Sequence, residues 1–263
     1  MPAIRAICLA SGSRGNSLFI EGGGVRILVD AGLSCRQIET RLIEVGIDPR
    51  SIDAILVTHE HMDHVSAVPL FSRRFGTPVY ASPRTACRLV AGGRSRERIG
   101  CIRDMEAGRT FRLGELSVTP FSIPHDAIDP LAFRFEIKGT ALALAADLGF
   151  VTDEVRERLA GCQAIFCESN HDPVMLQNGP YSLPLKKRVA GEAGHLSNPE
   201  CRNLVESVYH PDLKVVVLAH LSQKNNTPRL AYDETNSFFR MISAKTELRI
   251  AFQDKIGTPV EIG

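Results

Sequence analysis

Two strongly apolar runs in the sequence each lead into a histidine, and this feature limits the possible folds more than any other. The run 54–58 (AILVT) ends at His59, and the run 215–219 (VVVLA) ends at His220. Short runs of aliphatic and β-branched residues predict strands that are buried on both faces. Helix-like segments follow both runs. We therefore expect an α/β chain of two related halves, packed sheet against sheet with helices outside.

The other segments fit this arrangement. Ser34 is placed to cap a helix over 35–46 that Gly46 ends, and Ser197 and Glu200 are spaced as a capping box for a helix over 198–209. Residues 100–150 are rich in strand-like segments, and 248–253 (LRIAFQ) is expected to be the closing strand. The sequence contains no long polar linker, so we predict one domain over residues 1–263.

The composition of the chain indicates its cellular location and says little about its function. The net charge of +1 gives no global reason to expect nucleic-acid or membrane binding. No apolar run approaches the roughly 18 residues that a membrane span needs. The seven cysteines are an odd number and form no C-x-x-C pair. These features predict a reduced, cytoplasmic chain without a membrane segment; they leave its oligomeric state open.

A dense group of metal-ligand side chains follows the first apolar run. His59, His61, Asp63 and His64 fall within six positions. Histidine nitrogens and carboxylate oxygens suit zinc, and also manganese or iron. His125, Asp147 and His220 each lie at the end of another strand-like segment and supply what the first group lacks, including a carboxylate that can bridge two ions. We therefore predict a metal site.

This pattern of H-x-H-x-D-H followed by a His, an Asp and a His at strand ends resembles the metallo-β-lactamase superfamily. The resemblance implies a four-layer αββα sandwich with two divalent ions, which can be zinc, manganese or iron, at one edge of the sheets. It implies that one ion is bound by His59, His61, His125 and Asp147, and the other by Asp63, His64, Asp147 and His220. Asp30, in "ILVDAG", matches the aspartate that supports the site in this superfamily.

Two such ions would support hydrolysis by a metal-bridging hydroxide, which Asp63 could orient. The reaction class alone leaves a lactam, thioester, lactone or phosphodiester open as the substrate. Asp147 stands where true β-lactamases have Cys, and "IPHDAIDP" (123–130) stands where glyoxalase-type thioesterases have a "GHTPG"-like segment. Both departures count against those two substrate classes.

Two further segments favour phosphodiesters. "CESNHD" (167–172) and "AGHLSN" (193–198) resemble motifs of ribonuclease Z. Carried over, His195 contacts the phosphate or protonates the leaving oxygen, and Glu168 orients His195. Overall the chain resembles the compact WalJ (YycJ)-like group, which implies a nuclease, most simply an exonuclease acting on DNA rather than RNA. In that family "SGSRGNS" (11–17) lies near the metals, so Ser13 and Asn16 are expected substrate contacts.

Two other interpretations remain open at this point. A small-molecule hydrolase of the same fold would act on a cyclic phosphodiester, a lactone or an ester, in a closed apolar pocket rather than a basic groove. A catalytically inactive sensor would use the metals structurally, and the full set of seven ligands argues against it. His171, close to Glu168 in the sequence, is left without an assigned role.

One basic segment generates a prediction from sequence alone. Between Phe71 and Arg103 eight arginines stand against one acid, Glu97. If this segment neutralises phosphates, changing Arg94, Arg96 and Arg98 together to Ala will weaken DNA binding and flatten its salt dependence. Titration of labelled DNA at several salt concentrations measures both effects. An unchanged salt dependence would identify the segment as an ordinary solvated surface.

Overall fold

The strands form two seven-stranded sheets within the part of the chain that the computed structural model describes, residues 2–92 and 99–263. Arg94, Arg96 and Arg98 lie outside the described residues.

The first sheet has the order β14-β1-β2-β3-β4-β5-β6, and the second β13-β12-β11-β10-β9-β8-β7. The strands of the first sheet are β1 (Ile4–Ala10), β2 (Ser17–Gly22), β3 (Val25–Val29), β4 (Ala54–Leu56), β5 (Val79–Ala81), β6 (Ile102–Asp104) and β14 (Val260–Ile262). Those of the second are β7 (Phe111–Leu113), β8 (Leu116–Ser122), β9 (Leu131–Ile137), β10 (Thr140–Ala145), β11 (Ala164–Glu168), β12 (Val215–Ala219) and β13 (Glu247–Ile250).

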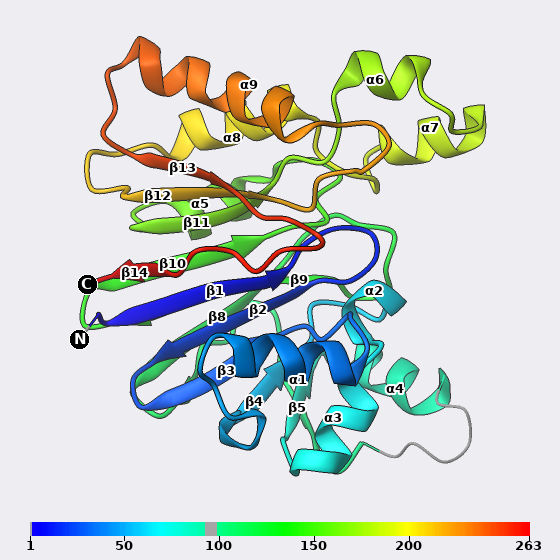
Figure 1. Cartoon of the computed structure of the whole chain (residues 1–263), viewed down its shortest axis with the longest axis vertical. Helices are drawn as coiled ribbons and strands as arrows, with labels where there is room; N and C mark the ends of the chain where they lie inside the picture. Colours follow the sequence, from blue (N-terminus) through cyan, green and yellow to red (C-terminus); the bar gives the residue numbers. More distant parts are fainter. Residues whose placement is uncertain (1, 93–98) are drawn as a thin grey trace.

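Helices cover the outer faces of both sheets (Figure 1). The helices of the first half are α1 (Cys35–Glu44), the short 3₁₀ helix η1 (Pro49–Ser51), α2 (Met62–Val65), α3 (Val68–Phe75) and α4 (Pro83–Gly92). Those of the second half are α5 (Asp153–Leu159), α6 (Pro173–Asn178), α7 (Leu183–Val189), α8 (Asn198–Val208) and α9 (Pro228–Met241). None of the helices among the described residues is both long and apolar enough to cross a bilayer.

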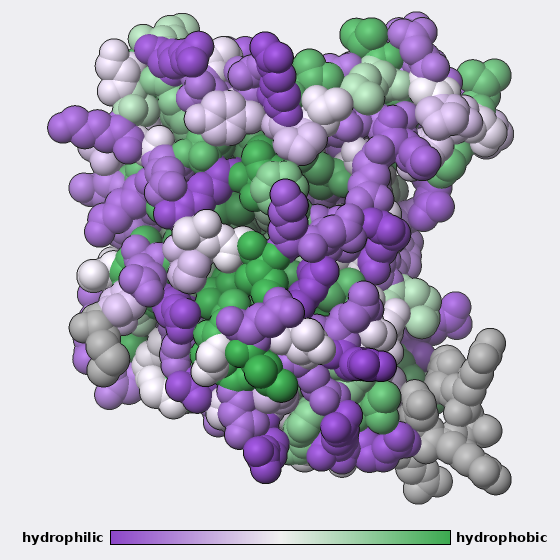
Figure 2. Space-filling view, viewed as in Figure 1, coloured by the Kyte–Doolittle hydropathy of each residue, from purple (hydrophilic) through white to green (hydrophobic). Residues whose placement is uncertain are grey.

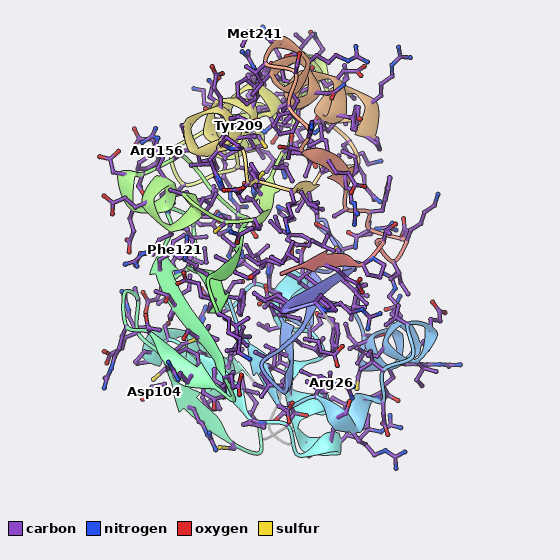
Figure 3. The ribbon with its side chains drawn as sticks, turned by 90° about the vertical axis from the view of Figure 1, so that its left-hand side faces the viewer. Arg26, Asp104, Phe121, Arg156, Tyr209 and Met241 are labelled. Carbon is purple, nitrogen blue, oxygen red and sulfur yellow. The ribbon has the colours of Figure 1, made fainter. Side chains whose placement is uncertain are left out.

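Three separate groups of buried apolar side chains hold the layers together. The central group lies between the sheets and joins residues such as Ile20 and Ile27 to Phe133 and Phe166. A second group packs the first sheet against α1 and α3, and a third packs the second sheet against α5, α8 and α9. Figure 3 shows the two sheets from the side, turned by 90°. The order helix, sheet, sheet, helix confirms the predicted four-layer αββα sandwich.

Strand β1 shows why these sequences form buried strands. Its side chains at Ile4, Ala6 and Cys8 enter the central core, whereas Ile7 and Leu9 point to the helix-covered face. Alternate residues of a strand point to opposite faces, so a strand between two apolar layers has to be apolar throughout. The predicted capping box of Ser197 and Glu200 is present at α8, and Ser34 caps α1 together with Gln37.

The C-terminal end of the chain differs from the sequence-based expectation. The segment predicted as the closing strand forms β13 only over Glu247–Ile250, and the chain then crosses to the other sheet. There the short strand β14 pairs antiparallel with β1. This strand contains only three residues, which is too few to produce a recognisable alternating pattern in the sequence.

The loop after β3 is locked against α2 by a close backbone contact at Gly32. A Cβ atom at this position would overlap the carbonyl oxygen of Asp63, and the Gly32 N–H donates to the carbonyl of Asn16 at 2.9 Å. The N–H of Asn16 in turn donates to the carbonyl of Asp63 at 2.7 Å. Three segments distant in sequence are thus held in one place by their backbones.

Replacing Gly32 by Ala should therefore destabilise the fold, because two backbones would have to separate. We expect the free energy of unfolding to fall by about 1–3 kcal/mol, the usual scale for overpacking, with a corresponding drop in Tm on thermal unfolding. Gly100→Ala is the control, since a Cβ there meets nothing closer than the Ser72 Oγ at 3.8 Å. Equal Tm values for the two variants would contradict the close-contact argument.

Candidate metal centre

The candidate site lies where the carboxyl ends of strands from both sheets meet. In the first sheet β3 and β4 run parallel, and in the second β10, β11 and β12 run parallel. Asp30 and His59 follow the first pair, whereas Asp147, Glu168 and His220 lie at the ends of the second group. Strand β8, which precedes His125, runs in the same direction as β10 because both pair antiparallel with β9. This edge is on the right in Figure 1, beside α2.

Three of these polar residues have left-handed backbone conformations. The φ angles are 60° at Asp30, 59° at Asp147 and 55° at His220. Such values are uncommon outside glycine and cost on the order of 1 kcal/mol. All three side chains are almost completely buried. Each turn thus directs a polar side chain inward at a strand end, and such strain accumulates at functional sites.

The first group of potential ligands contains three histidines. The nearest nitrogens of His59, His61 and His125 all lie within 4.8 Å of one another. His59 Nε2 is 3.0 Å from His61 Nδ1. His61 immediately precedes α2, and the other two ligands of this segment, Asp63 and His64, lie in the first turn of that helix.

The second group joins α2 to the end of β12. Asp63 Oδ2 lies 3.6 Å from His64 Nε2 and 3.9 Å from His220 Nε2. These three residues again place one ligand atom each within 4.8 Å of the others.

Asp147 lies between the two groups. Its Oδ2 is 3.3 Å from His64 Nε2, and its Oδ1 is 3.2 Å from His220 Nδ1 and 3.9 Å from His125 Nε2. One carboxylate therefore contacts members of both groups, as a bridging ligand must. The structure brings all seven sequence-predicted ligands together, and their binding of metal stays a prediction.

Behind the ligands, Asp30 fixes the orientation of His64. Its carboxylate accepts hydrogen bonds from the Thr58 backbone N–H and the Thr58 hydroxyl, both at 2.9 Å, and lies 2.8 Å from His64 Nδ1. With Nδ1 engaged, Nε2 is the nitrogen that faces the cluster. Burial by itself lowers the pKa of His64, but the carboxylates of Asp30 and Asp147 outweigh it and raise that pKa to about 9.

The other titratable groups fit a cation-binding role. Burial, together with the charge of His64 and the other imidazoles, lowers the pKa of His59 well below its usual range, so His59 is neutral, as a metal-ligating imidazole must be. Burial opposes ionisation of Asp63, but His220 and His64 hold the pKa of its carboxyl well below its usual range. The cluster thus offers a neutral His59 imidazole beside an ionised Asp63 carboxylate, whereas His64 has to release its proton when an ion binds.

His220 indicates that the cluster is suited to bind metal. Its Nε2 is buried and has no hydrogen-bond partner among the described residues. A buried polar atom without a partner is costly, so it calls for a bound ligand or another functional reason. The nitrogens of His59, His61 and His125 also lie within 4.8 Å of one another, as the ligands of one ion would. The donor set of histidines and aspartates therefore fits two divalent ions.

A second pair of groups, Glu168 and His195, adjoins the cluster. Glu168 is fully buried, and its Oε2 accepts the backbone N–H groups of Leu148 at 2.7 Å and Leu196 at 3.1 Å. Its Oε1 lies 2.8 Å from His195 Nδ1 and 2.7 Å from His220 Nδ1. Burial opposes ionisation, but the His195 and His220 imidazoles hold the pKa of Glu168 well below its usual range. The geometry brings together the two residues that the sequence motifs paired.

The two expected substrate contacts differ in position. Ser13 is exposed and lines a cleft together with His195. Asn16 is buried, and its Nδ2 lies 3.0 Å from His64 Nε2 and 3.4 Å from Asp63 Oδ2. Asn16 thus contacts ligand residues, and its contact with substrate stays a prediction. His171, which the sequence left undecided, is buried and forms a backbone bridge with Ser197.

The residues that support the ligands carry no motif of their own in the sequence. The Thr58 hydroxyl contacts His59 Nδ1 at 3.0 Å, Ser11 Oγ accepts the His220 N–H at 2.7 Å, and Asn170 Nδ2 donates to the His220 carbonyl at 2.9 Å. Ser11 is the first residue of the segment SGSRGNS (11–17). Thr58 directly precedes His59, and Asn170 follows Glu168 by two positions. Their adjacency is the one signal that could have found them.

Asp147→Asn tests the bridging position. Asn tolerates the left-handed backbone of residue 147 and keeps the shape of the side chain, but it removes the charge between the two groups. We expect the purified variant to contain at least one equivalent of metal less per chain than the unchanged protein, measured by elemental analysis. Asp104→Asn, at an exposed carboxylate on β6 (labelled in Figure 3), is the control and should retain full metal content. Full metal content in Asp147→Asn would remove the bridging role.

Comparison with known proteins identifies the family. A model described as the beta-lactamase superfamily domain matches residues 25–221. The chain is 34% identical over 226 residues to exodeoxyribonuclease WalJ of Streptococcus pneumoniae, covering 85% of this chain and 84% of that protein. It is 35% identical over 227 residues to exodeoxyribonuclease YycJ of Bacillus anthracis, with the same coverage of both chains.

The solved structure of Zn²⁺-bound PqqB from Methylobacterium extorquens has a TM-score of 0.71 at 18% identity. The match covers 98% of this chain and 100% of that one, and this likeness shows the fold. The chain therefore belongs to the beta-lactamase superfamily and is a metal-dependent hydrolase with the metallo-β-lactamase fold.

Proposed function

We propose that the chain is a dinuclear metal-dependent phosphodiesterase that acts as an exonuclease on DNA. The observation that carries this proposal is the Glu168–His195 pair beside the ligand cluster, where His195 Nδ1 lies 2.8 Å from Glu168 Oε1 and 3.6 Å from Asp147 Oδ1. The WalJ and YycJ relatives are exodeoxyribonucleases, which supports DNA as the substrate.

The proposed reaction assigns a role to each group. Two divalent ions, zinc or manganese, would supply an activated water and polarise the phosphate when bound. Asp63 orients the attacking water from its position between His64 and His220. His195 donates a proton to the leaving oxygen through Nε2, because Nδ1 is engaged by Glu168.

The electrostatics of His195 suit an acid. Burial by itself lowers the pKa of its imidazole, but the adjacent Glu168 carboxylate outweighs burial and raises that pKa above its usual value. An imidazole that stays protonated near neutral pH can release its proton to a developing alkoxide. Glu168 is thus a positioning residue, and His195 is the group that meets the substrate.

The described part of the basic segment gives partial support for a nucleic-acid substrate. Arg74 forms an ion pair with Glu39 at 2.6 Å, and Arg103 donates to the Tyr80 hydroxyl at 2.8 Å, so both serve the fold. Arg84 and Arg88 are exposed one turn apart on α4. Such a pair can contact successive phosphates.

A reducing location fits the state of the cysteines. All seven are free thiols, and five of them are buried. We infer a cytoplasmic protein from this, in agreement with the sequence pattern.

His195→Ala tests the proposed general acid. We expect both metals and the fold to be retained, since His195 is none of the seven assigned ligands, while turnover of DNA falls by roughly 10²–10⁴-fold. The loss should be smaller for bis-p-nitrophenyl phosphate, whose leaving group departs as a stable anion without a proton. Steady-state assays with metal-loaded protein on both substrates measure the difference.

His210→Ala is the matched control. His210 Nε2 bonds to the Cys162 carbonyl at 2.9 Å ahead of the amino end of β12, the opposite end of the strand from His220, so its loss should leave both activities unchanged. An equal, small loss on both substrates in His195→Ala would remove the general-acid role. A small-molecule hydrolase of the same fold would then be the better account.

A further inference from the structure

A cleft opens beside His195 with walls of two different kinds. Tyr181, Leu185 and Val189 form an apolar wall, and Ser13 and Ser222 lie among the polar residues of its lining. The cavity volume is about 240 Å³. In Figure 2 the outline of the molecule is indented on the right, below the position of α7.

The apolar wall is fixed relative to His195. Leu185 and Val189 are four residues apart on α7, so they share one face of the helix. The backbone N–H of His195 donates to the Val189 carbonyl at 2.9 Å, and a Cβ on Gly194 would overlap that same carbonyl oxygen. A molecule held against this wall therefore has a defined position relative to the imidazole.

The volume of the cleft limits what it can hold. It is slightly below the range of about 300–1,000 Å³ typical of sites for drug-sized ligands, so it has room for one ring system with its attached sugar. Tyr181 is half-buried and offers a flat aromatic surface that can stack on a ring. The rim carries Arg188, which forms an ion pair with Asp126, and the exposed Lys187 lies next to it. A planar ring beside a phosphate, near cationic side chains, is the chemistry of a nucleotide.

On the basis of the function proposed above, we propose that this cleft binds a single base, that of the nucleotide adjoining the scissile phosphate. Tyr181 stacks on the base, Leu185 and Val189 complete the apolar wall, and His195 meets the phosphate. Base–aromatic stacking tolerates any base, so the cleft positions the strand end without selecting a sequence.

The test removes the base from the DNA substrate and the aromatic ring from Tyr181 in separate experiments. Metal-loaded protein is assayed on two single-stranded DNA oligonucleotides that differ only in the terminal nucleotide, which is normal in one and abasic in the other. The unchanged protein should show a kcat/KM roughly 5- to 150-fold higher for the normal end, the range expected for one stacked base. Tyr181→Ala should lose this preference and cleave both substrates at the lower rate, whereas Tyr181→Phe, which keeps the ring, should retain it.

Tyr232→Ala, at an exposed tyrosine on α9, is the control and should leave the preference intact. The inference is overturned, with the proposed function still standing, if the unchanged protein cleaves both substrates equally well. It is also overturned if Tyr181→Ala is slower on both but keeps the preference, since Tyr181 would then only support the fold. Absence of cleavage of either DNA by the unchanged protein would instead refute the proposed function itself.

Discussion

The candidate site depends on the packing of one sheet against the other. His59, His61, Asp63 and His64 belong to the first half of the chain, whereas His125, Asp147 and His220 come from the second. The central apolar core sets the distance between these halves. Each ligand group combines residues of both halves, and Asp147 lies 3.3 Å from His64 of the first half. A shift of about 1 Å between the sheets would therefore separate the members of each group. Core packing and metal chemistry are therefore coupled in this fold.

The carboxylates where the two sheets meet have two different roles. Asp147 and Asp63 face the position expected for the ions, and Asp30 and Glu168 lie behind them and hold imidazoles through Nδ1. A buried carboxylate that accepts a bond from Nδ1 fixes the ring orientation and leaves Nε2 for a ligand or a substrate. The same arrangement thus orients His64 for the proposed metal role and His195 for the proposed acid role.

The sequence predicted the elements that have a strong pattern and missed those that have none. The apolar runs ending at His59 and His220, and the H-x-H-x-D-H cluster, predicted the buried strands and the grouping of seven side chains at one edge. Strand β14 and helices α6 and α7 are short and carry no clear period, so they were not recognised. Tyr181 was not identified from the sequence for a related reason. It lines the same cleft as His195 only because of how the chain packs around α7, and no spacing in the sequence encodes that proximity.

The most direct test of the account is a crystal structure of zinc-loaded protein with anomalous scattering recorded at the zinc edge. We expect two peaks about 3.5–4 Å apart, one among His59, His61 and His125 and the other among Asp63, His64 and His220, with the Asp147 carboxylate between them. A single peak, or two peaks of which neither contacts Asp147, would contradict the claim that ligands from both halves of the chain build one dinuclear centre.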